Sequence, residues 1–254
     1  MSAFNLIEFK SNEMTESNLI DSIENVKYDD CALIVRNGLS FFSKEEWPKF
    51  VTENCSLELD KRHYDIDSNL NLDDWWEVSY QPDKAISYAY SNTKQPFHSD
   101  NAWFQDPSEI NFFIMKKQAK KGGEQLVYPV KRLISDLKKE NRNLLENLQS
   151  TEVEIKKGEG DYSFNGKIIT LDPEPIIHWN YYRIIKTNQK VEQMCDSFFK
   201  YLSEKENSLS TNRILLNTGD IMFVNDLKIL HGRSAFTAEK AFDRILLQSM
   251  WKIK

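Results

Sequence analysis

The sequence contains few of the residues that build disulfide or zinc–thiolate frameworks. Its 254 residues include three cysteines, Cys31, Cys55 and Cys195, and no two of them form a Cys-x-x-Cys pair. An odd number of cysteines without regular spacing indicates a reducing compartment, so we expect neither a disulfide scaffold nor a thiolate zinc site. Cys31 and Cys195 lie in apolar stretches and are predicted to be core thiols.

Long apolar runs and long basic runs are also missing. No apolar stretch approaches the roughly 18 residues that a membrane helix needs, and residues 1–10 lack the pattern of a signal peptide. The formal net charge is -6, and the largest basic cluster is four lysines within residues 116–121. An acidic chain without a basic stripe is a poor candidate for nucleic-acid binding. We therefore expect a cytoplasmic protein whose partner is a small-molecule substrate, with no membrane and no nucleic acid.

The apolar segments indicate a mainly β protein. With 40% hydrophobic residues, the chain suits one domain over residues 1–254, with a helical or irregular part over 1–79 and a core over 80–254. Helices are predicted over 15–26, 42–53, 133–148 and 191–202. Strands are predicted over 32–35, 85–90, 110–115, 126–128, 164–171, 176–185, 214–217, 220–225, 227–230 and 244–253. Strands at both ends with helices inserted between them favour a double-stranded β-helix (a cupin-like jelly roll) over an alternating parallel α/β fold.

Only four histidines occur in the chain, and two of them stand in informative contexts. The first is His98, which is followed two residues later by Asp100. Residues two apart in a strand point to the same face, so His98 and Asp100 can direct an imidazole and a carboxylate to one point. A His-x-Asp triplet alone is common by chance and identifies nothing.

The second informative histidine is His231, which lies in the segment GDIMFVNDLKILHGR over residues 219–233. This segment predicts a Gly-Asp turn, an apolar strand, a tight turn at Asn225-Asp226 and a second apolar strand that ends on His231. Such a strand would hold the imidazole firmly at the mouth of a barrel.

Two histidines and one carboxylate make up the facial triad of non-haem Fe(II) sites, which leaves three adjacent coordination positions open. A bidentate 2-oxo acid can take two of these positions and O2 the third. We therefore predict that His98, Asp100 and His231 are the metal ligands and the catalytic centre. Zinc can use the same ligands, so a zinc hydrolase is an alternative.

Arg244 follows His231 by thirteen residues and opens the apolar segment 245–250. A guanidinium binds a carboxylate through two parallel hydrogen bonds. At this position it could hold the distal carboxylate of 2-oxoglutarate while the keto-acid end chelates iron. A zinc hydrolase gives no reason for an arginine at this spacing.

The order of these motifs, with Gly-Gly-Glu at 122–124 between them, resembles the taurine dioxygenase / γ-butyrobetaine hydroxylase / clavaminate synthase-like family over about residues 80–254. The resemblance implies an Fe(II)- and 2-oxoglutarate-dependent dioxygenase in which His98, Asp100 and His231 bind iron and Arg244 binds the co-substrate. It also implies O2 consumption, release of succinate and CO2, and hydroxylation of an unactivated carbon. The absence of a second arginine suggests a small polar substrate, such as an amino acid or a biosynthetic intermediate.

Three positions refine this expectation. Many relatives carry a hydroxyl residue just after the Gly-Gly turn, where Gln125 stands here and is predicted to contact 2-oxoglutarate. Gln248 stands where some relatives carry a second basic residue, which argues against a sulfonate such as taurine. Asp100 favours hydroxylation over halogenation, because related halogenases have a small residue there. Desaturation and cyclisation use the same oxidant and stay open as alternatives.

The candidates for substrate contact lie close to these motifs or, by the resemblance, near the substrate mouth. They are Tyr88, Asn92, Asn101, Trp103, Trp179, Asn180, Arg183 and Arg233. For Arg233 a structural ion pair is an equal alternative. Of the adjacent Trp75 and Trp76, one is expected to pack inward and the other to meet a ligand or lid, with plain core packing as the alternative for either one. A non-catalytic jelly-roll protein that binds a small molecule is the alternative from a different class, and Gln125 is the only feature that favours it.

Overall fold

Two main sheets enclose a common core. The computed structural model describes residues 4–64, 70–71, 74–157 and 162–254. The larger sheet has seven strands in the order β1-β2-β16-β8-β18-β3, with β6 also paired to β18. These strands are β1 (Asn5–Lys10), β2 (Cys31–Arg36), β3 (Leu57–Asp60), β6 (Trp76–Ser79), β8 (Ile110–Lys117), β16 (Ile221–Asn225) and β18 (Ile245–Ile253). The smaller sheet has the order β15-β9-β17-β7 and consists of β7 (Gln95–His98), β9 (Gln125–Pro129), β15 (Asn212–Ile214) and β17 (Ile229–Arg233).

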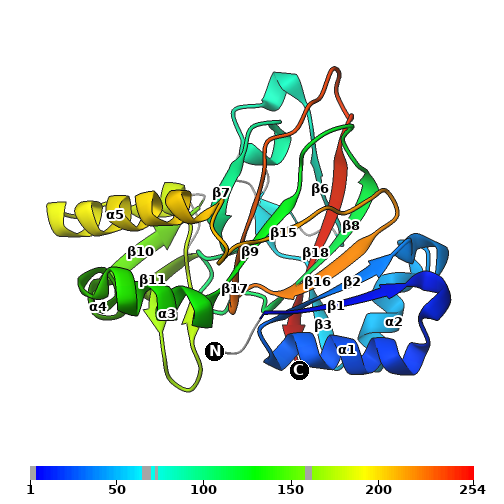
Figure 1. The fold of residues 1–254 in the computed structure, drawn as a ribbon, viewed down its shortest axis with the longest axis horizontal. Coiled ribbons are helices and arrows are strands. Elements are labelled where there is room, and N and C mark those ends of the chain that lie inside the picture. The colour runs from blue at the N-terminus through cyan, green and yellow to red at the C-terminus, as the bar shows by residue number, and fades with distance from the viewer. Residues whose placement is uncertain (1–3, 65–69, 72–73, 158–161) are drawn as a thin grey trace.

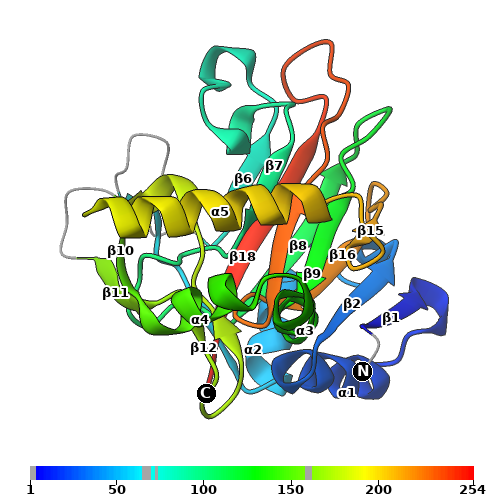
Figure 2. The same cartoon turned by 60° about the vertical axis from the view of Figure 1, so that its left-hand side comes forward.

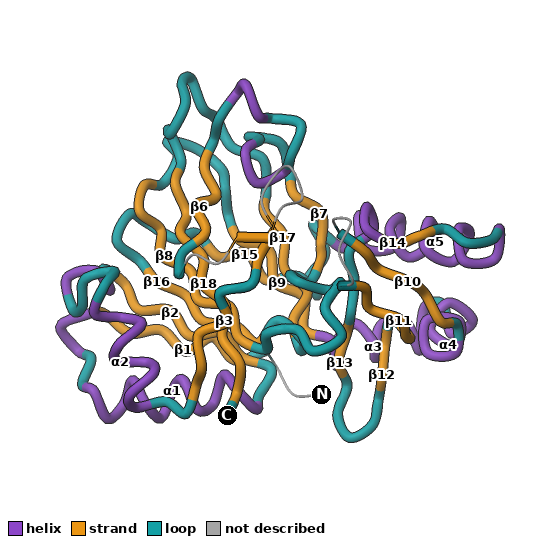
Figure 3. Tube along the Cα trace, turned by 180° about the vertical axis from the view of Figure 1, so that it is seen from behind, coloured by secondary structure: helices purple, strands orange, loops and turns teal. Residues whose placement is uncertain are grey.

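Helices flank the two sheets on opposite sides of the molecule (Figures 1 and 3). The larger sheet packs against α1 (Glu16–Tyr28) and α2 (Glu46–Asn54), and the smaller one against α3 (Val130–Glu140), α4 (Arg142–Ser150) and α5 (Gln189–Lys205). Short strands beside the second group of helices are β10 (Glu152–Lys156), β11 (Ser163–Lys167), β12 (Ile169–Thr170), β13 (Ile176–Ile177) and β14 (Ile184–Ile185), and β4 (His63–Tyr64) pairs with β5 (Leu70–Asn71). No helix in the described part of the chain is both long and apolar enough to cross a bilayer.

Alternation along the strands decides which side chains reach the space between the sheets. In β2, Leu33 and Val35 pack into the apolar cluster that contains the residues of α1 and α2. Ala32 and Ile34, on the opposite face, pack into the cluster between the sheets. This is the period of two that a sheet buried on both faces requires.

The same alternation in β17 orients His231. Ile229 belongs to the cluster between the sheets, whereas Leu230 belongs to the outer cluster with α3, α4 and α5. Because His231 is two residues from Ile229, its side chain points into the space between the sheets.

Three connections project together beyond one end of the sheets, where they are coloured teal, green and orange-red (Figures 1 and 2). They are residues 80–94, 118–124 and 234–244. Phe236 N donates to Asn92 O at 3.0 Å, and Gly123 N donates to Ala235 O at 3.2 Å. These bonds tie the three connections into one rim.

The predicted jelly roll with inserted helices is confirmed, and most predicted elements are present. Just before α2, Ser43 and Glu46 exchange two bonds: Ser43 N donates to Glu46 Oε2 at 2.8 Å, and Glu46 N to Ser43 Oγ at 3.2 Å. The leucine-rich segment 133–148 forms two helices, α3 and α4, instead of one.

Four predicted strands are wrong in whole or in part. The predicted strand 214–217 is a strand only at its first residue, because β15 ends at Ile214. Residues 85–90 contain a 3-10 turn at Tyr88–Tyr90, because Tyr90 N and Ser91 N bond back to Ser87 O and Tyr88 O within the segment. The segment 164–171 is split between β11 and β12. The segment 176–185 is interrupted by a 3-10 turn at Tyr181–Arg183. Local turn bonds replace ladder pairing in each turn, and hydrophobic alternation does not reveal them.

Candidate metal centre and substrate cavity

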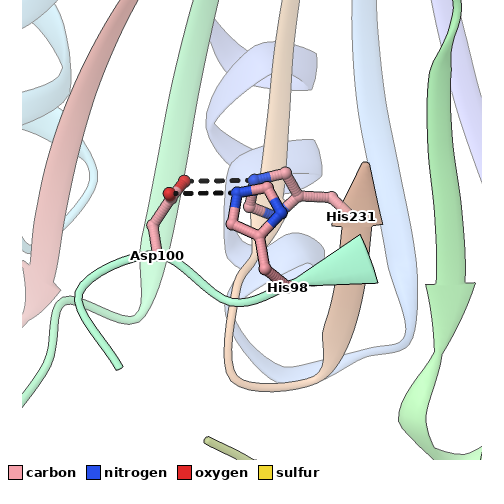
Figure 4. A group of neighbouring side chains, drawn as sticks. All are labelled: His98, Asp100 and His231. Atoms are coloured by element: carbon pink, nitrogen blue, oxygen red, sulfur yellow. Dashed lines mark ion pairs between the residues drawn. The ribbon is translucent and has the colours of Figure 1, made fainter. Parts of the chain in front are cut away.

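His98 and His231 lie opposite each other on neighbouring strands of the smaller sheet. They are register partners in β7 and β17, and their ring centroids are 4.3 Å apart. Asp100 Oδ1 lies 3.4 Å from His98 Nε2, and its Oδ2 lies 3.1 Å from His231 Nε2 (Figure 4). One ligand atom from each residue lies within 4.8 Å of the other two, so one metal ion can reach all three. A His-Asp-His set of this kind fits Fe(II) with open coordination positions.

A turn, and not strand alternation, brings Asp100 back to the imidazoles. The sequence suggested that His98 and Asp100 share a strand, and this detail is wrong because β7 ends at His98. Asn101 adopts a left-handed φ of 51°, which turns the chain. Asp100 N donates to Asp226 Oδ2 at 2.6 Å and holds this turn against the β16–β17 connection.

The Nδ1 atom of each imidazole lies close to an oxygen of the protein. His98 Nδ1 lies 2.9 Å from Pro96 O, and His231 Nδ1 lies 2.8 Å from Asp226 Oδ1. An acceptor at Nδ1 places the proton there and leaves the Nε2 lone pair available to a metal. Both rings therefore present the correct nitrogen to the centre.

Asp100 is held by two amide side chains. Its Oδ2 accepts from Gln248 Nε2 at 2.5 Å and from Asn111 Nδ2 at 2.9 Å. Burial raises the pKa of Asp100, but the neighbouring His231 and His98 outweigh this effect and hold the pKa well below its usual range. By contrast, burial raises the pKa of Asp226 to about 6 despite the attraction of His231. Asp100 is thus ionised near neutral pH, as a carboxylate ligand must be.

Arg244 lies in a small pocket beside the three residues, together with Gln125 and Arg233. Its side chain is 1% exposed, and its Nε and Nη2 have no hydrogen-bond partner in the described part of the chain. Burial and the neighbouring Arg233 lower the pKa of Arg244 to about 9. A buried cation without a counter-ion is costly, so this pocket suits a ligand that brings a carboxylate. Arg244 and Gln125 therefore line a pocket beside the three residues in which a carboxylate ligand could be held.

Arg233 bonds to the backbone of the rim. Its Nη2 donates to the carbonyls of Tyr88 at 3.1 Å, Ser91 at 2.9 Å and Thr93 at 2.9 Å. Within the described ranges it forms no ion pair, although an ion pair was one of the two roles expected for it. Arg233 holds the 88–93 segment in place, and this segment forms part of the wall of the substrate cavity.

A cavity of about 470 Å³ opens from His98 and Asp100. It is lined by five of the predicted substrate residues, Tyr88, Asn101, Trp103, Asn180 and Arg183. Residues that the sequence analysis did not assign to it include Lys157 and Tyr182, whose hydroxyl accepts from Tyr88 Oη at 2.9 Å. Trp76 also lines the cavity, while Trp75 packs against Phe112 at 5.4 Å, as expected for two adjacent tryptophans.

Some of the predicted substrate residues have other contacts. Trp179 is fully buried and packs against Phe198 with ring centroids 4.6 Å apart, outside the cavity lining. Asn92 also lies outside this lining, and its carbonyl accepts the N–H of Phe236. Asn101 borders the cavity, but its amide donates to Arg62 O at 3.2 Å and approaches Met250 S at 2.9 Å. The last contact fixes the turn that carries Asp100.

Comparison with known proteins finds curated relatives of part of the chain. The γ-butyrobetaine dioxygenases of Homo sapiens and Pongo abelii are each 24% identical to it over 183 residues, which is 67% of this chain and 47% of theirs. The chain thus spans about half the length of these curated relatives.

Two solved structures share the fold over most of the chain. An asparagine oxygenase in complex with Fe(II), 2S,3S-3-hydroxyasparagine and succinate matches with a TM-score of 0.72 and 13% identity, over 96% of this chain and 81% of that one. The non-heme iron oxygenase OrfP in complex with Fe and alpha-ketoglutaric acid matches with a TM-score of 0.68 and 12% identity, over the same shares. The model of the family described as "Taurine catabolism dioxygenase TauD, TfdA family" matches residues 9–251. Because this match covers nearly all of the sequence, the chain belongs to the TauD/TfdA dioxygenase family.

Proposed function

We propose that this protein is an Fe(II)- and 2-oxoglutarate-dependent oxygenase that hydroxylates an unactivated carbon of a small polar substrate and releases succinate and CO2. The observation that carries the proposal is the position of buried Arg244 beside the group His98, Asp100 and His231, with its Nε and Nη2 lacking hydrogen-bond partners among the described residues. A zinc hydrolase would use the three ligands, but it would have no need of a buried guanidinium in the adjoining pocket.

In this proposal each part of the site has one task. His98, Asp100 and His231 hold the iron, and Arg244 with Gln125 holds the distal carboxylate of 2-oxoglutarate. Iron, 2-oxoglutarate and O2 supply the oxidising chemistry. The chain supplies geometry: acceptors at both Nδ1 atoms orient the imidazoles, and two amides hold Asp100. The aromatic side chains along the cavity limit the access of water to the reacting carbon.

The size of the cavity and the proteins of similar fold support an amino acid or a biosynthetic intermediate as substrate. Structures of the similar oxygenases hold 3-hydroxyasparagine in one case and hydroxyarginine in another. Desaturation and cyclisation remain alternatives, because they use the same centre. We treat the whole chain as one oxygenase domain, since β1, β2, β3 and β6 from residues 1–79 complete the larger sheet. Three free, buried cysteines support the cytoplasmic placement expected from the sequence.

An anaerobic titration of the Fe(II)-loaded protein with 2-oxoglutarate tests the proposal. A visible charge-transfer band should appear in the wild type and be absent in His98→Ala. His178→Phe, which removes a buried imidazole outside the centre, is the matched control and should keep the band. Tight iron binding without a band in the wild type would contradict the proposal and favour a zinc enzyme or a binding protein.

A further inference from the structure

Away from the metal centre, the charged residues in the described wall of the substrate cavity are all cationic. Lys157 and Arg183 line it, and Asp100 is the one carboxylate that lines it within the described ranges. Asp100 already accepts bonds from Gln248 and Asn111 and faces both imidazoles. Away from the metal centre, the described wall therefore offers a ligand cationic groups and neutral groups only.

Arg183 is half-buried, and its guanidinium forms no hydrogen bond or ion pair within the part of the chain that the structure describes. Burial lowers its pKa, and no neighbouring carboxylate offsets this effect. Lys186, three residues further on, has a different environment, because its Nζ lies 2.8 Å from Asp196 Oδ1. Arg183 thus faces the cavity with its charge uncompensated, and an acidic group of a ligand would compensate it.

Three of the five tryptophan and tyrosine rings that line the cavity already face a lysine. Tryptophan and tyrosine faces can bind an ammonium group where no carboxylate is present. Here, however, Lys157 Nζ already lies 5.8 Å from the ring centre of Trp76 and 5.0 Å from that of Trp103. Lys84 Nζ similarly lies 5.6 Å from the ring centre of Tyr90. A second cation at any of these rings would be repelled by the first.

We infer that the substrate is an acid without a free ammonium group, such as an N-acylated amino acid or another carboxylic acid, and that Arg183 binds its acidic group. This inference rests on the proposed function for the identity of the cavity as the substrate site. It excludes free amino acids from the substrate class. The ammonium group of a free amino acid would have no counter-charge in the described wall except Asp100, which the proposed function assigns to the metal.

Calorimetric titrations of the anaerobic protein, loaded with Fe(II) and 2-oxoglutarate, test the inference with matched probes. The probes are the free, the N-acetyl and the N-acetyl amide forms of amino acids with aromatic, apolar and polar side chains. We expect at least one N-acetyl acid to bind more tightly than its free form and its amide. Arg183→Gln should weaken that binding by about ten- to a hundredfold, as expected for the loss of hydrogen bonds between charged groups. Arg142→Gln, which changes an exposed arginine on α4, should leave it unchanged.

Three results would overturn the inference: tighter binding of the free amino acids, an unchanged affinity in Arg183→Gln, or no binding of any N-acetyl acid. The charge-transfer band, recorded in the same samples, separates this inference from the proposed function. If the band is normal but the N-acetyl acids do not bind preferentially, this inference is wrong and the proposed function still holds. If the N-acetyl acids bind preferentially but the charge-transfer band is absent, the proposed function is wrong and the protein is an acid-binding protein.

Discussion

His231 Nδ1 lies 2.8 Å from Oδ1 of Asp226, a carboxylate that is 1% exposed. The other oxygen of Asp226 accepts the N–H of Asp100 at 2.6 Å. One side chain therefore orients the imidazole of one predicted ligand and the backbone of another. Only a carboxylate presents two acceptors in this way, because an amide would place N–H groups against one of the two donors.

Asp226→Asn should accordingly weaken Fe(II) binding while the protein remains folded. We expect the affinity to fall by about ten- to a hundredfold, the usual effect of removing a group that orients a metal ligand. An anaerobic Fe(II) titration measures it, with circular dichroism as the check on folding. Glu174→Gln is the control, because it makes the same chemical change at an exposed carboxylate, which pairs with the buried Lys228. Equal Fe(II) affinities in the two variants would show that Asp226 does not position the centre.

Arg244→Ala should weaken the binding of 2-oxoglutarate and leave the affinity for Fe(II) nearly unchanged. Loss of a two-bond guanidinium–carboxylate contact should raise the half-saturating concentration of 2-oxoglutarate by about a hundredfold or more. The charge-transfer band gives this concentration, and Fe(II) affinity without 2-oxoglutarate should change little. Were Fe(II) binding lost to the same extent, Arg244 would be needed for the fold of the site and would not be a co-substrate ligand.

Substitution of the two rim glycines, Gly122 and Gly123, should affect two different properties: the stability of the fold and the requirement for 2-oxoglutarate. Both have a φ of 78°, so alanine at either position costs about 1–2 kcal/mol in backbone strain. At Gly122 a Cβ would lie 2.2 Å from the backbone oxygen of Ala235, whereas at Gly123 it would lie 3.0 Å from Arg244 Nε. Gly122→Ala should therefore be the less stable variant in urea denaturation. Gly123→Ala should show the larger rise in the 2-oxoglutarate requirement, and the reverse order would contradict this account.

Two features of the candidate centre were accessible from the local sequence: the orientation of His231 and the place of Arg244 beside it. His231 is two residues from Ile229 in an apolar strand, so the two side chains point to the same face, and this spacing is visible in the sequence. Arg244 was found by its spacing from His231 within the motif order that the chain shares with a known family. Neither prediction required knowledge of which strands become neighbours.

The contacts that support the centre could not be predicted, because they join distant segments. Gln248 reaches Asp100 across 148 positions of the chain, and nothing near Gln248 in the sequence marks it as a partner of the centre. The 85–90 segment looked like a strand, but Arg233 holds the adjoining backbone carbonyls from far along the chain. Trp179 was selected for its place in the sequence, and its burial against Phe198 depends on the packing of α5.

His178 makes the stability of the fold depend on pH in a way that can be isolated. Its ring stacks on Phe164 with centroids 4.0 Å apart and is 5% exposed, and this burial lowers its pKa to about 4. In the unfolded chain an imidazole has a pKa of about 6.5, so between these two values the unfolded state binds more protons. This contribution to stability is complete above about pH 6.5 and is lost as the pH falls toward 4, by up to about 1.4 kcal/mol per pH unit and about 3 kcal/mol in all.

His178→Phe keeps a ring at the position and removes the titration, so its free energy of unfolding should fall less on acidification than that of the wild type. Urea denaturation of both proteins at a series of pH values measures this difference, in which the shared titration of the metal centre cancels. If the free energy of unfolding fell equally in both proteins on acidification, the prediction would be wrong. Folded His178 would then bind a proton as readily as the unfolded chain does, contrary to its burial against Phe164.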